Sequence, residues 1–194
     1  IKNEFDWEKY GCEDPRVTKI NDKFYIFYTA LSKYPPDKES IKIGLAISKD
    51  FKKIEEKHLV TPFNAKAMSI FPKKINGNFV GILTADTDVL PSKIGIAYFK
   101  SEDQIWDERY WQNWYRKIDH YVLPLLRSTD DQVEVGAVPI ETEKGWLLIF
   151  SYIKNYLSSK KIFGVEAVLL DLDNPLKIIG KTEEAFMVPE KDYE

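Results

Sequence analysis

Three segments of similar sequence follow one another along the chain, and this repeat constrains the fold more than any other feature. They lie at residues 15–28, 71–83 and 138–150. Each is typical of a strand, a tight turn and a second strand. The dipeptides that suit the positive φ angles of hairpin turns are Asn21-Asp22, Asn76-Gly77 and Lys144-Gly145. The chain is therefore expected to contain a repeated β-hairpin unit.

A further strand is expected after each hairpin, at residues 42–48, 93–98 and 163–170. Short antiparallel sheets repeated at this period predict the blades of a β-propeller. The second hairpin strands, such as residues 24–28, are apolar on both faces, which favours blades that pack on one another. A β-sandwich also contains repeated hairpins, but it does not predict the same strand–turn–strand–loop–strand order three times. The predicted class is an all-β propeller.

Length and charge limit the other possibilities. With 194 residues and 44% hydrophobic side chains, the chain is expected to form one propeller domain over residues 1–194. A closed ring needs strands for roughly two more blades. The chain also begins with Ile1 and stops at Glu194, so it is expected to be truncated at both ends.

Several partners are not expected. The net charge is −3 with no basic stripe, which argues against nucleic acid. No apolar run approaches the roughly 20 residues of a membrane-spanning helix. The single cysteine, Cys12, excludes an internal disulfide and fits a reducing compartment, so a cytoplasmic location is expected. Cys12 is interpreted as a packed residue, since no histidine neighbours it in sequence to activate a thiol.

Four phrases carry a resemblance to a known family. They are residues 11–18 (Gly-Cys-Glu-Asp-Pro-Arg-Val-Thr), 66–72 (Lys-Ala-Met-Ser-Ile-Phe-Pro), 142–149 (Thr-Glu-Lys-Gly-Trp-Leu-Leu-Ile) and 169–175 (Leu-Leu-Asp-Leu-Asp-Asn-Pro). In this order they resemble glycoside hydrolase family 130, the β-mannoside phosphorylases and β-mannosidases. The resemblance implies a five-bladed β-propeller, of which this chain covers about three to four blades.

The resemblance also implies roles for individual residues. Asp14 matches the general acid of the family and Arg16 a residue that holds the mannose at the cleaved bond. Glu13 belongs to the same motif and is expected to bind sugar hydroxyls, and Lys66 is retained as a further substrate-binding residue. Pro15 is expected to bias Asp14 toward an extended backbone. The alternative is that Glu13, Asp14 and Arg16 form a salt bridge that locks a blade.

The chain departs from the phosphorylases of the family where they bind phosphate. Thr84 or Ala85 stands near the expected Arg, Ser151-Tyr152 replaces a His-Gly pair, and Ala67 replaces the Asp that follows Lys66. Loss of an Arg and a His weakens a phosphate site, which favours hydrolysis.

An inverting hydrolase needs a second carboxylate to activate water. Glu134 is the candidate base, because its position before the third hairpin is equivalent to that of Glu13 before the first. Asp130 and Asp131 are held in reserve. The alternative interpretation of Glu134 is a solvated loop carboxylate.

The predicted function is hydrolysis of β-linked mannosides by single-displacement inversion, with Asp14 as acid and Glu134 as base. The alternatives are a β-mannoside phosphorylase that releases mannose 1-phosphate, a non-catalytic carbohydrate-binding propeller, and a glycosidase of another five-bladed clan. No metal or organic cofactor is expected, and inorganic phosphate takes part only in a phosphorylase. The expected partner is an oligosaccharide or small mannoside, and a homo-oligomer is left open. Aromatic residues near helical spacing at 106–115 are interpreted mainly as packing.

Overall fold

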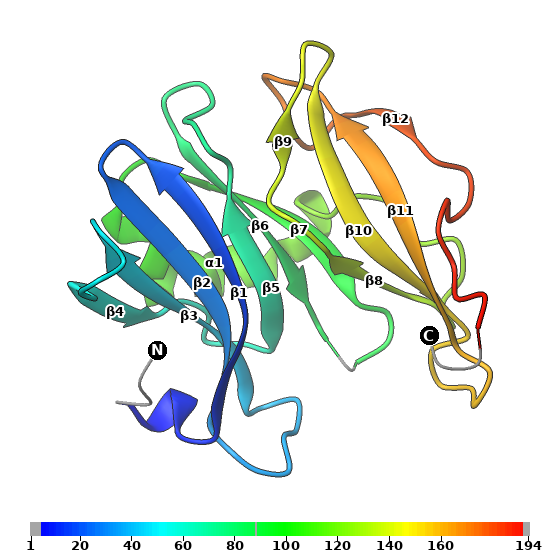
Figure 1. Cartoon of the computed structure of the whole chain (residues 1–194), viewed down its shortest axis with the longest axis horizontal. Helices are drawn as coiled ribbons and strands as arrows, with labels where there is room; N and C mark the ends of the chain where they lie inside the picture. Colours follow the sequence, from blue (N-terminus) through cyan, green and yellow to red (C-terminus); the bar gives the residue numbers. More distant parts are fainter. Residues whose placement is uncertain (1–4, 88, 192–194) are drawn as a thin grey trace.

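A computed structural model describes residues 5–87 and 89–191 of the chain. Within these residues the strands form three antiparallel sheets that stand side by side as blades (Figure 1). This confirms the all-β propeller class predicted from the repeat. The predictions made on the ends, at Ile1 and residues 192–194, lie outside the described residues.

Each blade is a short meander of hydrogen-bonded neighbours. The first blade contains β1 (Gly11–Ile20), β2 (Lys23–Leu31), β3 (Ile41–Ser48) and β4 (Glu56–Leu59). The second contains β5 (Ala65–Ile70), β6 (Phe79–Ala85) and β7 (Lys93–Phe99). The third contains β8 (Gln132–Val135), β9 (Ile140–Glu141), β10 (Trp146–Lys154), β11 (Ile162–Leu170) and β12 (Ile178–Lys181). The partner strands predicted after each hairpin are confirmed as β3, β7 and β11.

The positive φ angles expected in the hairpin turns are found at both residues of Asn76-Gly77 and at Asn21, but not at Asp22. Asn21 has a φ of 53°, and Asn76 and Gly77 have φ of 49° and 80°, as hairpin turns require. The third turn closes differently: the Thr142 hydroxyl accepts hydrogen bonds from the backbone of Lys144 and Gly145, both at 3.2 Å. Neither Lys144 nor Gly145 has a positive φ, so that expectation was wrong, and the Thr142 side chain holds this turn instead.

The middle blade also begins earlier than expected. Its inner strand is β5, which ends at Ile70, whereas the sequence placed that strand from Phe71 onward. Residues 71–78 instead form a loop closed by a single bridge between Ile75 and Asn78.

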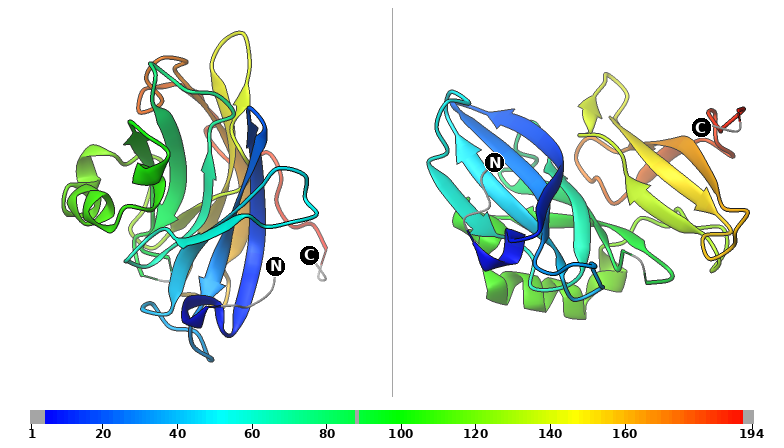
Figure 2. Two further views of the ribbon diagram at one scale, coloured as in Figure 1. Left: turned by 90° about the vertical axis from the view of Figure 1, so that its left-hand side faces the viewer. Right: turned by 60° about the horizontal axis from the view of Figure 1, so that its bottom comes forward.

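One α-helix, α1 (Glu108–Arg116), is present in the described residues, between β7 and β8. Asp107 caps it by accepting a hydrogen bond from the Tyr110 backbone, and Trp111 and Trp114 are buried. Figure 2 shows the helix on the side of the sheets away from the view of Figure 1. The interpretation of this aromatic segment as packing is confirmed for both tryptophans. Short 3₁₀ turns lie at Asp6–Glu8, Asp103–Trp106 and Ile118–His120.

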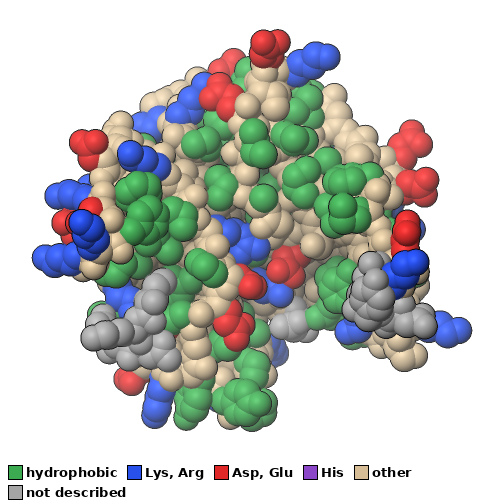
Figure 3. All heavy atoms as spheres, in the orientation of Figure 1, with side chains coloured by type: hydrophobic (Ala, Val, Ile, Leu, Met, Phe, Trp, Pro, Cys, Tyr) green, Lys and Arg blue, Asp and Glu red, His purple; other side chains and the backbone are tan. Residues whose placement is uncertain are grey.

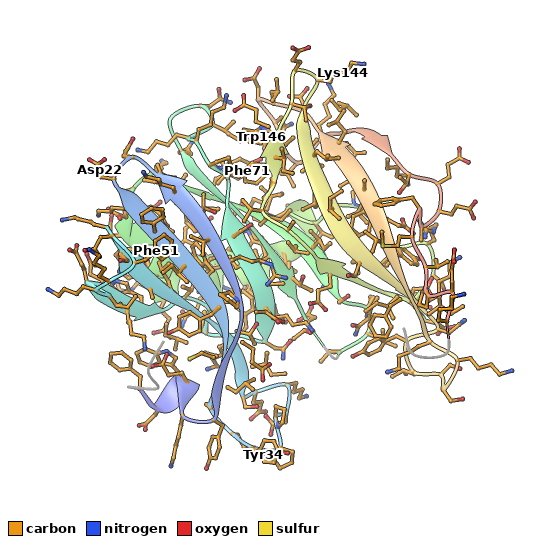
Figure 4. All side chains as sticks on the ribbon, viewed as in Figure 1. Asp22, Tyr34, Phe51, Phe71, Lys144 and Trp146 are labelled. Carbon is orange, nitrogen blue, oxygen red and sulfur yellow. The ribbon has the colours of Figure 1, made fainter. Side chains whose placement is uncertain are left out.

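The core lies between the blades. In β6, Phe79 and Leu83 pack into the cluster shared with the first blade, whereas Val80 and Ile82 pack into the cluster shared with the third. Between the second and third blades, the Trp146 ring meets the Phe71 ring edge-on, with ring centroids 5.0 Å apart (Figure 4). The middle sheet is thus buried on both faces, which is why its central strand, β6, is apolar except for Thr84.

Among the described residues no helix is long and apolar enough to cross a membrane.

Gly44 offers a test of this packing. A Cβ at Gly44 would lie 2.4 Å from Cζ of Tyr28, whose ring is buried and whose hydroxyl donates to Glu8 at 2.5 Å. Because the ring cannot move away, Gly44→Ala is expected to lower the free energy of unfolding by about 1–3 kcal/mol. The matched control is Gly180→Ala, where the nearest atom lies at 3.8 Å. Urea unfolding measures both, and equal stability of the two variants would contradict the close approach.

Candidate active site

Equivalent positions of the three inner strands carry charged side chains. Glu13 of β1 pairs with Thr29, Lys66 of β5 with Thr84, and Glu134 of β8 with Ser151. The predicted equivalence of Glu134 and Glu13 is therefore confirmed by strand register. The inner strands of successive blades thus carry Glu13, Lys66 and Glu134 at equivalent positions, so that negative, positive and negative side chains follow one another.

An irregularity of the backbone directly follows the first two of these positions, Glu13 and Lys66. The register shifts between Glu13 and Arg16 in β1 and between Lys66 and Ser69 in β5. Asp14 and Ala67, the residues after Glu13 and Lys66, have φ of 50° and 57°. The expected extended backbone at Asp14 was wrong, because a β-bulge holds this residue in the left-handed region. The bulge turns an exposed Asp14 away from the regular pleat.

Lys66 and Glu134 meet across the gap between the second and third blades. Their Nζ and Oε2 atoms lie 2.8 Å apart, and both side chains are about three-quarters covered. Glu134 therefore lies in a strand and in an ion pair, and it is not the solvated loop carboxylate of the alternative interpretation. In Figure 3 acidic and basic side chains gather near the middle of the face, where β1, β5 and β8 come together.

The reserve carboxylates lie elsewhere in the third blade. Asp131 is buried and accepts hydrogen bonds from the Tyr152 hydroxyl at 2.7 Å and the Asn155 backbone at 2.9 Å. Asp130 is exposed, and its carbonyl accepts from the Tyr156 backbone. Asp131 therefore has a structural role in its loop.

Arg16 links the first blade to the third. Its Nε donates to the Gly136 carbonyl at 3.0 Å and its Nη2 to the Val135 carbonyl at 2.9 Å. Nη1 donates to the Asp14 carbonyl at 3.0 Å. Burial lowers the pKa of Arg16, and the nearby carboxylates of Asp14 and Glu134 partly oppose that shift.

Arg16 thus locks blades together, but not by the salt bridge considered as an alternative. No ion pair joins Arg16 to Glu13 or Asp14 among the described residues. Its acceptors are backbone carbonyls, which fix the guanidinium between the predicted acid and the predicted base. It is held beside the place where a sugar is expected.

A cavity of about 280 Å³ brings part of the predicted site together. Glu13, Asp14 and Lys66 line it, as the sequence predicted for a site. The sequence did not point to its other lining residues, which are Tyr10, Thr29, Leu31, Tyr34, Pro36 and Ile41. The sequence does contain a pattern that could have identified Thr29. Thr29, Thr84 and Ser151 each follow the first aromatic residue of their strand by five residues.

Comparison with known proteins identifies the family. The family model of glycoside hydrolase family 130, described as "beta-1,4-mannooligosaccharide phosphorylase", matches residues 1–194. The chain belongs to glycoside hydrolase family 130. It is 33% identical over 199 residues to a 1,2-β-oligomannan phosphorylase of Thermoanaerobacter sp., covering 100% of this chain and 59% of that protein.

Other relatives of the same family also match nearly the whole chain. A β-1,2-mannobiose phosphorylase of Listeria innocua is 28% identical over 97% of this chain and 48% of its own length. The solved structure of the Listeria innocua β-1,2-mannobiose phosphorylase in complex with β-1,2-mannobiose superposes with a TM-score of 0.72 at 27% identity, covering 97% of this chain and 49% of that one. The chain spans about half to three-fifths of the length of the curated relatives it matches.

The positions where this family-130 chain departs from the expected phosphate site are buried or paired. The Thr84 hydroxyl accepts a hydrogen bond from the Val135 backbone at 2.9 Å, and Ala85 is buried. Ser151 lies opposite Glu134. Thr84, Ala85 and Ser151 carry no charge. In the described part of the chain, Lys66 forms an ion pair with Glu134, and Arg16 is close enough to feel its charge.

Cys12 packs against the apolar cluster of the first blade. The Cys12 thiol donates to Glu8 at 3.6 Å, and burial together with the Glu8 charge raises its pKa to about 11. A thiol with this pKa is protonated at neutral pH and is a poor nucleophile. Within residues 5–87 and 89–191, no group of three or more His, Cys, Asp or Glu side chains is arranged to hold a metal ion.

Arg16→Lys tests the link between the blades. A lysine carries one ammonium and cannot reproduce the fork that reaches three carbonyls. We expect the free energy of unfolding to fall by about 1.5–3 kcal/mol, the range for hydrogen bonds to a charged group. The control is Arg109→Lys on the exposed face of α1, which should change little. Equal melting temperatures of both variants and the parent would refute the link.

Proposed function

We propose that this protein is a β-mannoside phosphorylase. The observation that carries the proposal is the cavity in which Glu13 and Asp14 of β1 meet Lys66 of β5. The two curated relatives described above are named as mannoside phosphorylases, of a 1,2-β-oligomannan and of β-1,2-mannobiose. The matching family model names a β-1,4-linked substrate, so we propose a β-mannoside without assigning its linkage.

In the proposed reaction a phosphate oxygen attacks the anomeric carbon as the glycosidic C–O bond breaks. Asp14 gives its proton to the leaving sugar oxygen, directly or through a sugar hydroxyl. The products are mannose 1-phosphate and the shortened sugar. Glu13 binds sugar hydroxyls. Lys66 and Arg16 offset the charge of the phosphate, and Glu134 holds the Lys66 ammonium in place at 2.8 Å.

Hydrolysis is the second candidate, and one observation favours it. Thr84 and Ser151 stand opposite Lys66 and Glu134, near the positions where the family resemblance implies an Arg and a His in a phosphorylase. In this reaction Glu134 takes a proton from water, which attacks the anomeric carbon, while Asp14 again protonates the leaving oxygen. The prediction of hydrolysis remains a prediction.

Product analysis with and without inorganic phosphate separates the two reactions. The protein is incubated with β-1,2-mannobiose or β-1,4-mannobiose, and the products are resolved by anion-exchange chromatography. We expect phosphate-dependent mannose 1-phosphate. Free mannose formed at the same rate without phosphate would instead establish hydrolysis. No change in either disaccharide would favour the non-catalytic carbohydrate-binding alternative.

Asp14→Asn tests the assignment of the acid. The amide cannot donate the proton, so turnover should fall at least about 100-fold. Circular dichroism should remain that of the parent protein. The control is Asp22→Asn, an exposed carboxylate in the first hairpin turn at the opposite end of β1, as Figure 4 shows. Unchanged turnover by Asp14→Asn would disprove its role.

A further inference from the structure

One polar atom in the cavity lacks a partner. Thr29 is 4% exposed, and its hydroxyl makes no hydrogen bond with any described residue. It lines the cavity together with Glu13, Asp14 and Lys66. A buried hydroxyl left unbonded carries a desolvation cost, so its presence calls for a partner from outside the chain.

The equivalent residue of the next blade, Thr84, uses its hydroxyl to join two blades. Thr84 occupies in β6 the place that Thr29 occupies in β2, opposite Lys66 instead of Glu13. Its hydroxyl accepts the Val135 backbone N–H at 2.9 Å and so joins the second blade to the third. Thr29 has no such bond, so both its donor and its acceptor capacity are left unused by the described residues, at a position that lines the cavity.

The loop at residues 32–40 closes the cavity on one side and is held in a defined shape. The Ser32 backbone donates to the Ser40 carbonyl at 3.1 Å, and Asp37 accepts from the Ser40 backbone at 3.0 Å. Asn64 of the second blade donates to the Lys38 carbonyl at 2.7 Å. The loop is therefore fixed at its own base and to the neighbouring blade.

This loop presents an aromatic ring at the cavity. Tyr34 lines the cavity although it is 75% exposed, and the apolar side chains of Leu31, Pro36 and Ile41 line the same wall. Figure 4 shows Tyr34 at the end of the molecule opposite the hairpin turns. An exposed ring beside polar groups offers an apolar face and a polar edge to a ligand that has both.

The geometry points to a sugar subsite formed by the Thr29 hydroxyl and the Tyr34 ring, beside Asp14. Thr29 hydrogen-bonds a ring hydroxyl of the mannoside, and Tyr34 packs on the C–H face of a sugar ring. A pyranose fits this arrangement because it combines hydroxyls at its edge with apolar C–H faces. This inference rests on the proposed function for the identity of the sugar, and it assigns two residues to substrate binding that the site motif does not contain.

Calorimetric titration with β-1,2-mannobiose tests the subsite, using the full chain and the variants Thr29→Val, Tyr34→Ala and Tyr34→Phe. Thr29→Val removes only the hydroxyl and should weaken binding roughly threefold to tenfold, as expected for one neutral hydrogen bond. Tyr34→Ala should weaken it by at least about threefold, whereas Tyr34→Phe should stay within about twofold of the parent, because the ring is kept.

Melting temperatures distinguish a ligand contact from a structural role. Thr29→Val should melt at the same temperature as the parent or higher, since no internal hydrogen bond is lost. Thr84→Val is the matched control, and it should melt lower because it loses the bond to Val135. A lower melting temperature for Thr29→Val, comparable to that of Thr84→Val, would assign Thr29 to the fold and overturn the subsite.

The binding and turnover measurements test the subsite and the proposed function separately. Unchanged mannobiose affinity in Thr29→Val and Tyr34→Ala, with normal turnover of the parent, would overturn the subsite and leave the proposed function intact. Weakened affinity in the variants, with a parent protein that converts no mannoside, would support the subsite and refute the phosphorylase. Absence of binding by the parent protein would overturn the subsite.

Discussion

The burial of the middle sheet on both faces is the interaction on which the rest of the structure depends. Alternate side chains of β6 enter the clusters shared with the first and third blades, so one strand contributes to two cores. Buried hydroxyls reinforce the same interfaces: Thr18 donates to the Ile70 carbonyl at 2.9 Å, and Ser92 to the Val133 carbonyl at 2.8 Å. Packed in this way, the inner edges of the blades converge, and charged residues far apart in sequence become neighbours.

The candidate site is a consequence of that convergence. Glu13, Lys66 and Glu134 occupy one register position in three blades, and the bulges beside the first two turn the backbone at the same point. Alternation of charge reduces repulsion, because Lys66 shares a cavity with Glu13 and an ion pair with Glu134. Arg16 then ties the first blade to the third through carbonyls. This frame fixes the Arg16 guanidinium on backbone carbonyls and the Lys66 ammonium on Glu134.

Much of the fold could be predicted because its signals are local. Hairpin turns at Asn21 and at Asn76-Gly77, together with two-faced apolar strands, identified the blade unit, and the partner strands followed. The outer strands β4 and β12 were not predicted, since four-residue segments at a partly exposed edge lack a clear apolar pattern. The left-handed backbone at Asp14 was also missed, because the bulge arises from the register in which β1 pairs with β2 and not from the residues themselves.

The sequence by itself determined that the chain repeats a β-hairpin unit, that its strands need cover on both faces, and which motif carries Glu13, Asp14 and Arg16. These properties follow from side-chain polarity and turn chemistry, which neighbours along the chain express directly. Only the tertiary structure decided that Lys66 pairs with Glu134 and that Arg16 donates three hydrogen bonds to backbone carbonyls. It also decided that Thr29 and Tyr34 line the same cavity as Asp14. The physical reason is that these relations depend on how blades stack and on where each strand bulges, and the pattern along the chain does not show which side chains stacking brings into contact.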